Sequence, residues 1–266
     1  LMSGCRKKQE LTSSFDGLGV TSAASSRNYI TLLYSSSDTF NPYTAVTDIN
    51  RQLCRLMYEP LVKTDNDFNA VNCLAESVTL NGKTCTVALK NALFSDGSAV
   101  TADDVVYSFN AAKGSATEYA YKLYGAVSAA ASGGKTVVFN LAKADPYFVN
   151  LIDFPIMKKG SEARADEDGK APPIGAGRYV SDDGMTKLTV NTKYYGGSLN
   201  INEIRLINAP DSESVSHYVE VGAADMYYSD ISDGNIVRMS GKKVSINLNR
   251  IVFIGVNKAY GELANA

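Results

Sequence analysis

The segment FSDGSAVTADDVVYSF, residues 94–109, predicts a tight turn that leads into a capped helix. Asp96 and Gly97 form the turn, because glycine tolerates the backbone angles that tight turns often require. Thr101 is a good N-cap, and Asp104 lies three residues later, where its carboxylate approximates a capping box. Apolar residues then recur at helical spacing and predict a buried stripe: Val105, Val106, Phe109 and Ala112.

Strand patterns flank this helix on both sides. Before it, residues 78–80 and 85–89 alternate around an Asn-Gly pair at 81–82, which readily forms the tight turn of a hairpin. After it, residues 136–141 alternate in the same way and predict a second hairpin strand. Residues 62–170 are therefore expected to form an inserted β-rich α+β subdomain.

The segments outside this insert combine further strands and helices. Residues 29–34 are rich in strand-forming side chains, and residues 49–57 carry an apolar stripe that predicts a helix ending at Glu59-Pro60. The later elements are strands at 187–190, 204–207, 244–248 and 251–256, and a helix capped by Asp211 or Ser212. Residues 28–61 and 171–266 are expected to form the α/β core of a lobe, with a mixed β-sheet flanked by helices.

The first residues, LMSGC, resemble the end of a bacterial lipoprotein signal. The cysteine at position 5 would then carry the lipid. Serine, threonine and glycine dominate the following residues up to 27, a composition typical of a flexible tether. Residues 1–27 are therefore expected to be a signal remnant and tether that holds a folded body at the membrane. The alternative is a truncated chain in which LMSGC is accidental.

The composition excludes several classes of function. The net charge of -2 and the pI near 5.6 give no basic surface for a nucleic acid, so no such partner is expected. Of the 266 residues, 45% are hydrophobic, which is enough for a sizeable core. No apolar run approaches the roughly 18 to 20 residues that span a bilayer. With no CxxC motif and one histidine, His217, the chain lacks the ligands of a usual zinc site, and neither a metal nor a cofactor is expected.

Three cysteines remain besides Cys5, namely Cys54, Cys73 and Cys85. In an extracellular protein an odd number leaves at least one free thiol. Cys73 and Cys85 flank the predicted hairpin and could sit on neighbouring strands. A bridge between them and a fully reduced set are both compatible with the sequence.

No catalytic arrangement stands out in the sequence. A hydrolase needs a nucleophile, a base and an orienting group in register. His217 lies between Ser216 and Tyr218 in a predicted helix with no nucleophile motif beside it. The chain has neither a GxSxG motif nor the glycine loop of a P-loop enzyme. The chain is therefore not expected to be an enzyme.

Four segments, in order along the chain, resemble one family: the dipeptide-, oligopeptide- and nickel-binding class of extracellular solute-binding proteins, family 5. They are Asn41-Pro42 with the later YEPLV at 58–62, FSDGSAVTADDVVYSF at 94–109, GAGRY at 175–179, and YYGG at 194–197 with Ile204, Pro210-Asp211 and GAADM at 222–226. The chain departs from the family pattern in having Arg178 in place of proline, Tyr195 in place of tryptophan and Ala223 in place of an acidic residue.

The resemblance implies a type II periplasmic-binding-protein-like lobe, with the second lobe absent from this chain. It implies a monomeric substrate-binding component of an ABC transporter, which captures short peptides outside the cell and delivers them to permease subunits. It also implies a location at the extracellular face of the cytoplasmic membrane, held there by a lipid on Cys5, or in the periplasm. The alternatives are a binder of a nickel chelate, haem or an oligosaccharide in the same family, and a lipoprotein that senses peptides for signalling.

The resemblance also implies where a ligand would be contacted. Loops at strand ends carry such contacts, since a rigid scaffold holds them while their polar groups stay available. The candidate ligand-binding residues come from three places: Val46, Thr47 and Asp48 with Arg55 in the following helix, Tyr119 in the insert, and Tyr228, Ser229 and Asp230 after the GAADM motif. The alternative for each is an ordinary role on the surface or in the core.

Overall fold

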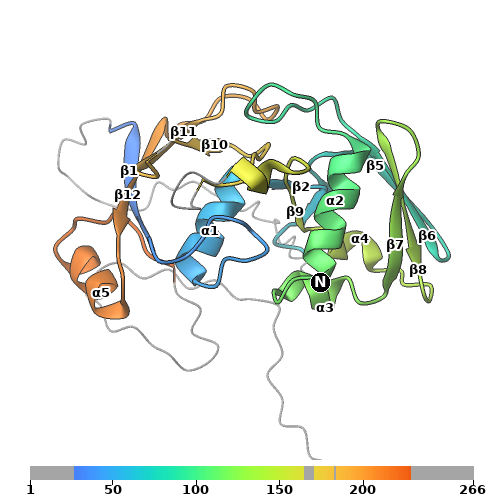
Figure 1. Cartoon of the computed structure of the whole chain (residues 1–266), viewed down its shortest axis with the longest axis horizontal. Coiled ribbons are helices and arrows are strands. Elements are labelled where there is room, and N and C mark those ends of the chain that lie inside the picture. The colour runs from blue at the N-terminus through green and yellow to red at the C-terminus, as the bar shows by residue number, and fades with distance from the viewer. Residues whose placement is uncertain (1–26, 165–170, 183, 229–266) are drawn as a thin grey trace, which may run out of the picture.

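The computed structural model describes residues 27–164, 171–182 and 184–228 (Figure 1). The predicted lipid site at Cys5, the candidates Ser229 and Asp230, and the predicted strands 244–248 and 251–256 lie outside these residues.

The first sheet has four strands in the order β1-β12-β11-β10. They span Tyr29–Tyr34 (β1), Tyr179–Ser181 (β10), Lys187–Val190 (β11) and Glu203–Asn208 (β12). β1 and β12 run parallel, and the other two pairs are antiparallel, so the sheet is mixed as predicted. The predicted strands 29–34 and 187–190 are confirmed, and the strand predicted at 204–207 extends by one residue at each end.

Helix α1, Asp48–Met57, packs on the side of this sheet that carries Leu32 and Ile204. Its buried residues are Asn50, Leu53, Cys54 and Met57, whereas Leu56, predicted to lie in the stripe, is only partly buried. The helix ends at Met57. Glu59–Pro60, which were predicted to end the helix, instead form the short strand β2, which pairs with β9 at Pro155–Ile156.

The second sheet has the order β5-β6-β8-β7 and is antiparallel throughout. Its strands are Ala75–Asn81 (β5), Thr84–Leu89 (β6), Ala126–Ala131 (β7) and Thr136–Leu141 (β8). The hairpin predicted to turn at Asn81-Gly82 turns one residue later, because Asn81 pairs with Thr84. Gly82 still supplies the left-handed backbone angle, with φ of 57°. β7 was not predicted, because AVSAAA lacks the bulky alternation of a strand.

Helix α2, Ala102–Lys113, lies against the second sheet, where it contacts β7 and β8 (Figure 1). The predicted capping box is confirmed: the Asp104 carboxylate accepts from the Thr101 N–H over 2.9 Å, and the Thr101 hydroxyl accepts from the Asp104 N–H over 3.4 Å. Of the predicted stripe, Val106 is only half-buried. The remaining elements are β3 (Val62–Thr64), β4 (Ala70–Asn72), α3 (Glu118–Lys122), α4 (Phe148–Leu151), the 3-10 turn η1 (Ser161–Arg164) and α5 (Ser212–Glu220).

One hydrophobic core joins the two sheets. It runs from Leu32 and Ile204 of the first sheet, past α1 and α2, to Val87 and Phe139 of the second. A smaller cluster lies under α5, which is capped by Asp211 as one of the two predicted alternatives. The predicted division into residues 1–27, 28–61 with 171–266, and 62–170 stays a prediction.

Cys54, Cys73 and Cys85 are buried and free, so the possible bridge between Cys73 and Cys85 does not form. Burial raises the pKa of the Cys85 thiol to about 11, which keeps it protonated at neutral pH. Among residues 27–164, 171–182 and 184–228, no helix combines the length and apolar character that a membrane span requires.

Candidate functional site

The chain between β1 and α1 is held in place by the carboxylate of Asp38. This carboxylate accepts hydrogen bonds from the Val46 N–H over 3.1 Å, the Thr47 N–H over 2.8 Å and the Thr47 hydroxyl over 2.6 Å. Partial burial raises the pKa of Asp38, but the hydrogen bonds from Thr47 and Val46 outweigh it and hold the pKa below its usual value. Thr47 is the N-cap of α1, whereas the Val46 side chain is 71% exposed and points to solvent.

Asn50, which is fully buried in α1, fixes the same loop from its other side. Its Oδ1 accepts from the Ser35 N–H over 2.9 Å, and its Nδ2 donates to the Ser35 carbonyl over 3.0 Å and to the Thr39 carbonyl over 3.3 Å. The side-chain amide thus pairs with the backbone just after β1. Asn50 was not among the residues predicted from sequence; its signal was a polar side chain at a position that helical spacing assigns to the buried face of α1.

The loop after α5 is docked on β1 by Asp225. The Asp225 carboxylate accepts from the Thr31 N–H over 2.7 Å, and the Asp225 N–H donates to the Thr31 carbonyl over 2.9 Å. Arg27 pairs with the second carboxylate oxygen at 3.1 Å. These contacts place Tyr227 and Tyr228 beside α1.

A small apolar pocket forms where this loop meets α1. We call it the α1–Tyr228 pocket. It has a volume of about 50 Å³ and is lined by Leu32, Leu33, Ile49, Gln52, Leu53, Met226, Tyr227 and Tyr228. The structure therefore brings the candidate Tyr228 next to the first turns of α1. The candidate Asp48 precedes Ile49 on the same helix, with its side chain 59% exposed and 3.6 Å from Arg51.

The candidates Arg55 and Tyr119 do not line the α1–Tyr228 pocket. Arg55 lies seven residues after Asp48, about 10 Å along the helix axis. Its guanidinium is 3.9 Å from the carboxylate of Glu118, the neighbour of Tyr119. Tyr119 is only 8% exposed and packs edge-on against Tyr43, with ring centroids 6.0 Å apart. A ligand-contacting role for Arg55 and Tyr119 stays a prediction.

The GAGRY segment packs directly against the carboxyl end of α1. The Gly177 N–H donates to the Met57 carbonyl over 2.9 Å. A Cβ at Gly177 would lie 2.3 Å from the Met57 carbonyl carbon, and a Cβ at Gly175 would lie 2.1 Å from the Met57 oxygen. Both glycines are therefore required by close backbone approach, not by turn geometry.

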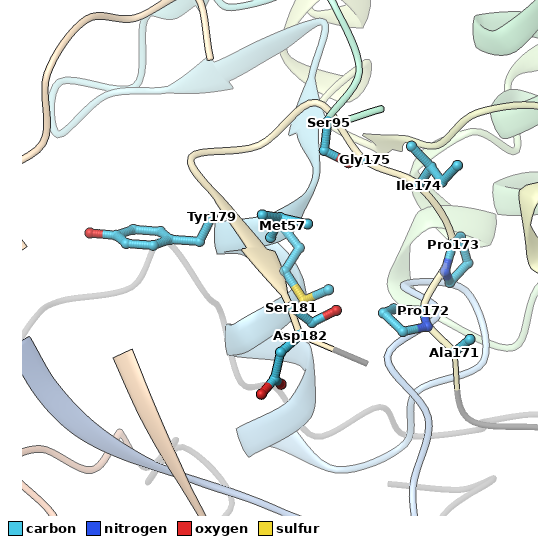
Figure 2. A pocket seen from close by; sticks show the side chains of 11 residues that line it. Met57, Ser95, Ala171, Pro172, Pro173, Ile174, Gly175, Tyr179, Ser181 and Asp182 are labelled. Carbon is cyan, nitrogen blue, oxygen red and sulfur yellow. The ribbon is translucent and has the colours of Figure 1, made fainter. Parts of the chain in front are cut away.

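A larger pocket opens beside this contact (Figure 2). We call it the β10 groove. Its volume is about 260 Å³, and it lies between Met57 and the β10 region on one side and the 171–175 segment on the other. Its lining comprises Met57, Ser95, Ala171, Pro172, Pro173, Ile174, Gly175 and the strand residues Tyr179, Val180, Ser181 and Asp182. None of the candidate residues lines the β10 groove. The groove is formed by a strand edge, which no local sequence pattern reveals.

Comparison with known sequences gives a consistent result. The profile described as bacterial extracellular solute-binding proteins, family 5 Middle, matches residues 69–265. The glutathione-binding protein GsiB of Escherichia coli O6:K15:H31 is 28% identical over 183 residues, which are 66% of this chain and 36% of GsiB.

Two solved structures share the fold. The oligopeptide-binding protein AppA from Bacillus subtilis, in complex with a nonapeptide, gives a TM-score of 0.58 at 23% identity over 74% of this chain and 44% of AppA. NikA from Staphylococcus aureus, in complex with Ni(L-His)2, gives 0.58 at 22% identity over 74% of this chain and 42% of NikA. The chain thus has the fold of the first lobe of type II periplasmic binding proteins, and it spans less than half the length of these relatives.

Proposed function

This chain belongs to the bacterial extracellular solute-binding proteins of family 5, and from that membership we propose that it is the substrate-binding component of an ABC importer. Its cargo is a short peptide, captured outside the cell and delivered to a membrane permease. The relatives are solute-binding proteins, which supports a binding role without catalysis.

The observation that carries this proposal is the meeting of two distant segments at the α1–Tyr228 pocket. Ile49 and Gln52 come from the helix after β1, whereas Tyr227 and Tyr228 come from the loop after α5. The loop after β1 leads into α1 at the carboxyl end of that strand, and the loop after α5 is docked on β1 by Asp225. The carboxyl ends of strands are where open α/β sheets bind ligands. Val46, Thr47, Asp48 and Tyr228 would form one wall of the cleft, and Ser229 and Asp230 would continue it.

A peptide is the cargo that the sequence relatives favour. GsiB is named for glutathione, which is a tripeptide, and it matches 66% of this chain at 28% identity. The walls of the α1–Tyr228 pocket are mostly apolar, with Tyr228 offering both a ring and a hydroxyl. These features suit a peptide side chain better than a charged metal chelate. A nickel chelate, as in NikA, is the second candidate.

Capture follows from lobe closure. A ligand that contacts both lobes stabilises the closed state by the difference between its affinities for the closed and open states. The wall formed by α1 changes little in such a step, because Asp38 and Asn50 already fix its loop. We also propose that Cys5 carries a lipid, that the protein works as a monomer on the outer face of the membrane, and that it passes its cargo to permease subunits.

The test is a thermal-shift assay on the full-length protein with a mixed peptide library and, separately, with Ni(L-His)2. Peptides are expected to raise the melting temperature, because a ligand that binds only the folded state stabilises it by mass action. A shift with the nickel complex and none with peptides would reject the peptide assignment.

A pair of variants localises the binding. Tyr228→Ala is expected to weaken peptide binding about tenfold, a loss typical of one well-packed aromatic contact. Tyr124→Ala is the control, because Tyr124 is 88% exposed and lines neither pocket. Equal affinities for the two variants would remove Tyr228 from the proposed site.

A further inference from the structure

Strand β10 is at the edge of the first sheet, and its backbone groups alternate between β11 and the open side. The Asn191 N–H donates to the Arg178 carbonyl over 2.9 Å, and the Asp182 N–H donates to the Lys187 carbonyl over 3.2 Å. Every second residue from Arg178 to Asp182 therefore turns its N–H and C=O groups toward β11.

The intervening residues, Tyr179 and Ser181, turn their N–H and C=O groups to the free edge. Within the part of the chain that the structure describes, none of these four groups has a hydrogen-bond partner. Both residues line the β10 groove. The Tyr179 ring points away from it in Figure 2, with its hydroxyl bound to the Ile201 carbonyl over 2.8 Å. Tyr179 therefore faces the groove with its backbone N–H and C=O groups and not with its side chain.

In the described residues, the opposite wall forms no hydrogen bond with Tyr179 or Ser181. Pro172 and Pro173 have no N–H group to donate. The Ile174 N–H donates to the Ser161 hydroxyl over 2.9 Å, and the Pro173 carbonyl accepts from the Tyr58 hydroxyl over 2.9 Å. The two walls therefore do not pair with each other, and the groove between them stays open.

We propose that the β10 groove binds a short extended peptide, which adds to the free edge of β10 as a further antiparallel strand. Tyr179 and Ser181 stand two strand positions apart, about 6.7 Å, and present two donors and two acceptors. An extended peptide backbone carries the complementary pattern at the same spacing. The volume of about 260 Å³ lies just below the range of about 300–1,000 Å³ for drug-sized ligands, so the groove suits about two or three small residues.

Asp182 gives the peptide a direction. Asp182 lines the groove at the carboxyl end of β10, and its carboxylate accepts from the Thr186 N–H over 2.8 Å and from the Lys187 N–H over 3.3 Å. In an antiparallel guest the amino terminus lies at that end. A negative charge there attracts the ammonium group of a free amino terminus and repels a terminal carboxylate. The expected ligand is therefore an unblocked peptide with small side chains.

This binding site does not rest on the proposed import function. The β10 groove includes Met57 at the carboxyl end of α1, whereas the α1–Tyr228 pocket adjoins its first turns. A peptide in the groove would protect the backbone amides of β10 from hydrogen exchange. Cargo in the α1–Tyr228 pocket would instead protect the backbone amides around Tyr228. The two proposals can therefore fail separately.

The test is hydrogen exchange of backbone amides in the full-length protein with trialanine as the probe. In the free protein the Tyr179 and Ser181 amides are expected to exchange faster than the Val180 amide, which faces β11. Trialanine at ten times its dissociation constant should slow the two edge amides about tenfold. Edge amides that are already protected without peptide, or protection confined to residues 227–228, would overturn the groove proposal.

Two matched controls show whether the backbone is what binds. Trialanine methylated on its amide nitrogens cannot donate to the edge and should give no protection; equal protection by this analogue would contradict strand addition. In the protein, Ser181→Pro removes one outward N–H and should weaken trialanine about fivefold, the loss of one net hydrogen bond. Ser181→Ala keeps that N–H and should bind like the natural protein. A loss in Ser181→Ala equal to that in Ser181→Pro would assign the contact to the hydroxyl and reject the proposal.

Discussion

The two sheets are assembled over different distances along the chain. The second sheet joins β5 to β6 through a two-residue turn, and β7 and β8 follow α2 as a second hairpin. The first sheet pairs Tyr29 with Glu203 and depends on polar contacts between remote segments, such as Asp225 with Thr31 and Asn50 with Ser35. Both pockets border the first sheet. Both pockets thus lie where the chain closes over long range, whereas the second sheet joins two local hairpins through the longer-range pairing of β6 with β8.

The largest effect is expected in the second sheet. Phe139 is fully buried. The centroid of its ring lies 5.5 Å from that of Phe109, 5.8 Å from that of Phe148 and 6.4 Å from that of Phe154. Phe139→Ala should lower the free energy of unfolding by about 3 to 5 kcal/mol, because it leaves a cavity among these rings. Urea denaturation measures this loss. Val127→Ala, at a 61% exposed position of β7, is the control and should change the free energy by less than about 0.5 kcal/mol.

The next effect concerns the long-range contact at the end of α1. Gly177→Ala places a methyl group 2.3 Å from the Met57 carbonyl carbon, and a backbone atom cannot swing aside. The expected loss is about 2 to 3 kcal/mol of unfolding free energy. Gly134→Ala is the matched control, since no atom lies within 4 Å of the place that its methyl group would occupy. Equal stabilities of the two variants would mean that α1 and GAGRY separate easily and that the first sheet does not depend on this long-range contact.

A smaller effect is expected at the buried amide that joins α1 to β1. Asn50→Leu leaves the Ser35 N–H and C=O groups without their partner, at a cost of about 2 kcal/mol. Hydrogen exchange at Ser35 should quicken while Val87 in the second sheet is unchanged. Asn110→Leu makes the same substitution on the exposed side of α2 and is the control. It should leave the exchange rate at Ser35 unchanged. Faster exchange in both sheets would show that the effect of the substitution is not confined to the first sheet.

The smallest effect is a pH dependence at Asp96. Its burial raises the pKa, but hydrogen bonds from Lys158 and Ser98 prevail and lower it to about 2. Because the folded pKa is depressed, the stabilisation is present above the unfolded value of 3.8 and is lost as the pH falls toward 2. Asp96 is 32% exposed, so solvent limits the effect to below about 1 kcal/mol. Urea midpoints between pH 5 and pH 2 should fall less steeply for Asp96→Asn; identical slopes would contradict this account.

Local patterns predicted the elements whose own residues carry the pattern, even where the pairing partner is remote, as it is for β1. β1, β11 and the capping box of α2 follow from alternation and from Thr101 and Asp104, which interact over three residues. The strand at Glu59–Pro60 could not be predicted in this way, because its two residues are too short a run to carry a pattern and its partner Pro155–Ile156 lies far along the chain. The turn at Gly82 was displaced by one residue because pairing with Thr84 extends β5 through Asn81.

The candidate site divides in the same manner. Tyr228 was named as a candidate from the order of motifs, and the structure places it beside Ile49 and Gln52. Asp38 and Asn50, which hold that helix, were missed because their partners are backbone groups of a loop with no sequence signature. The β10 groove was missed for a related reason: its chemistry is carried by N–H and C=O groups, which every residue has.

The buried amide of Asn50 has a consequence for the thermodynamics of the proposed capture. The Asn50 side chain bonds the Ser35 N–H and C=O groups, as the backbone of a neighbouring strand would. The loop before α1 is therefore ordered without a bound solute. Little conformational entropy remains for this wall to lose on association, so the entropic penalty falls mainly on the guest molecule.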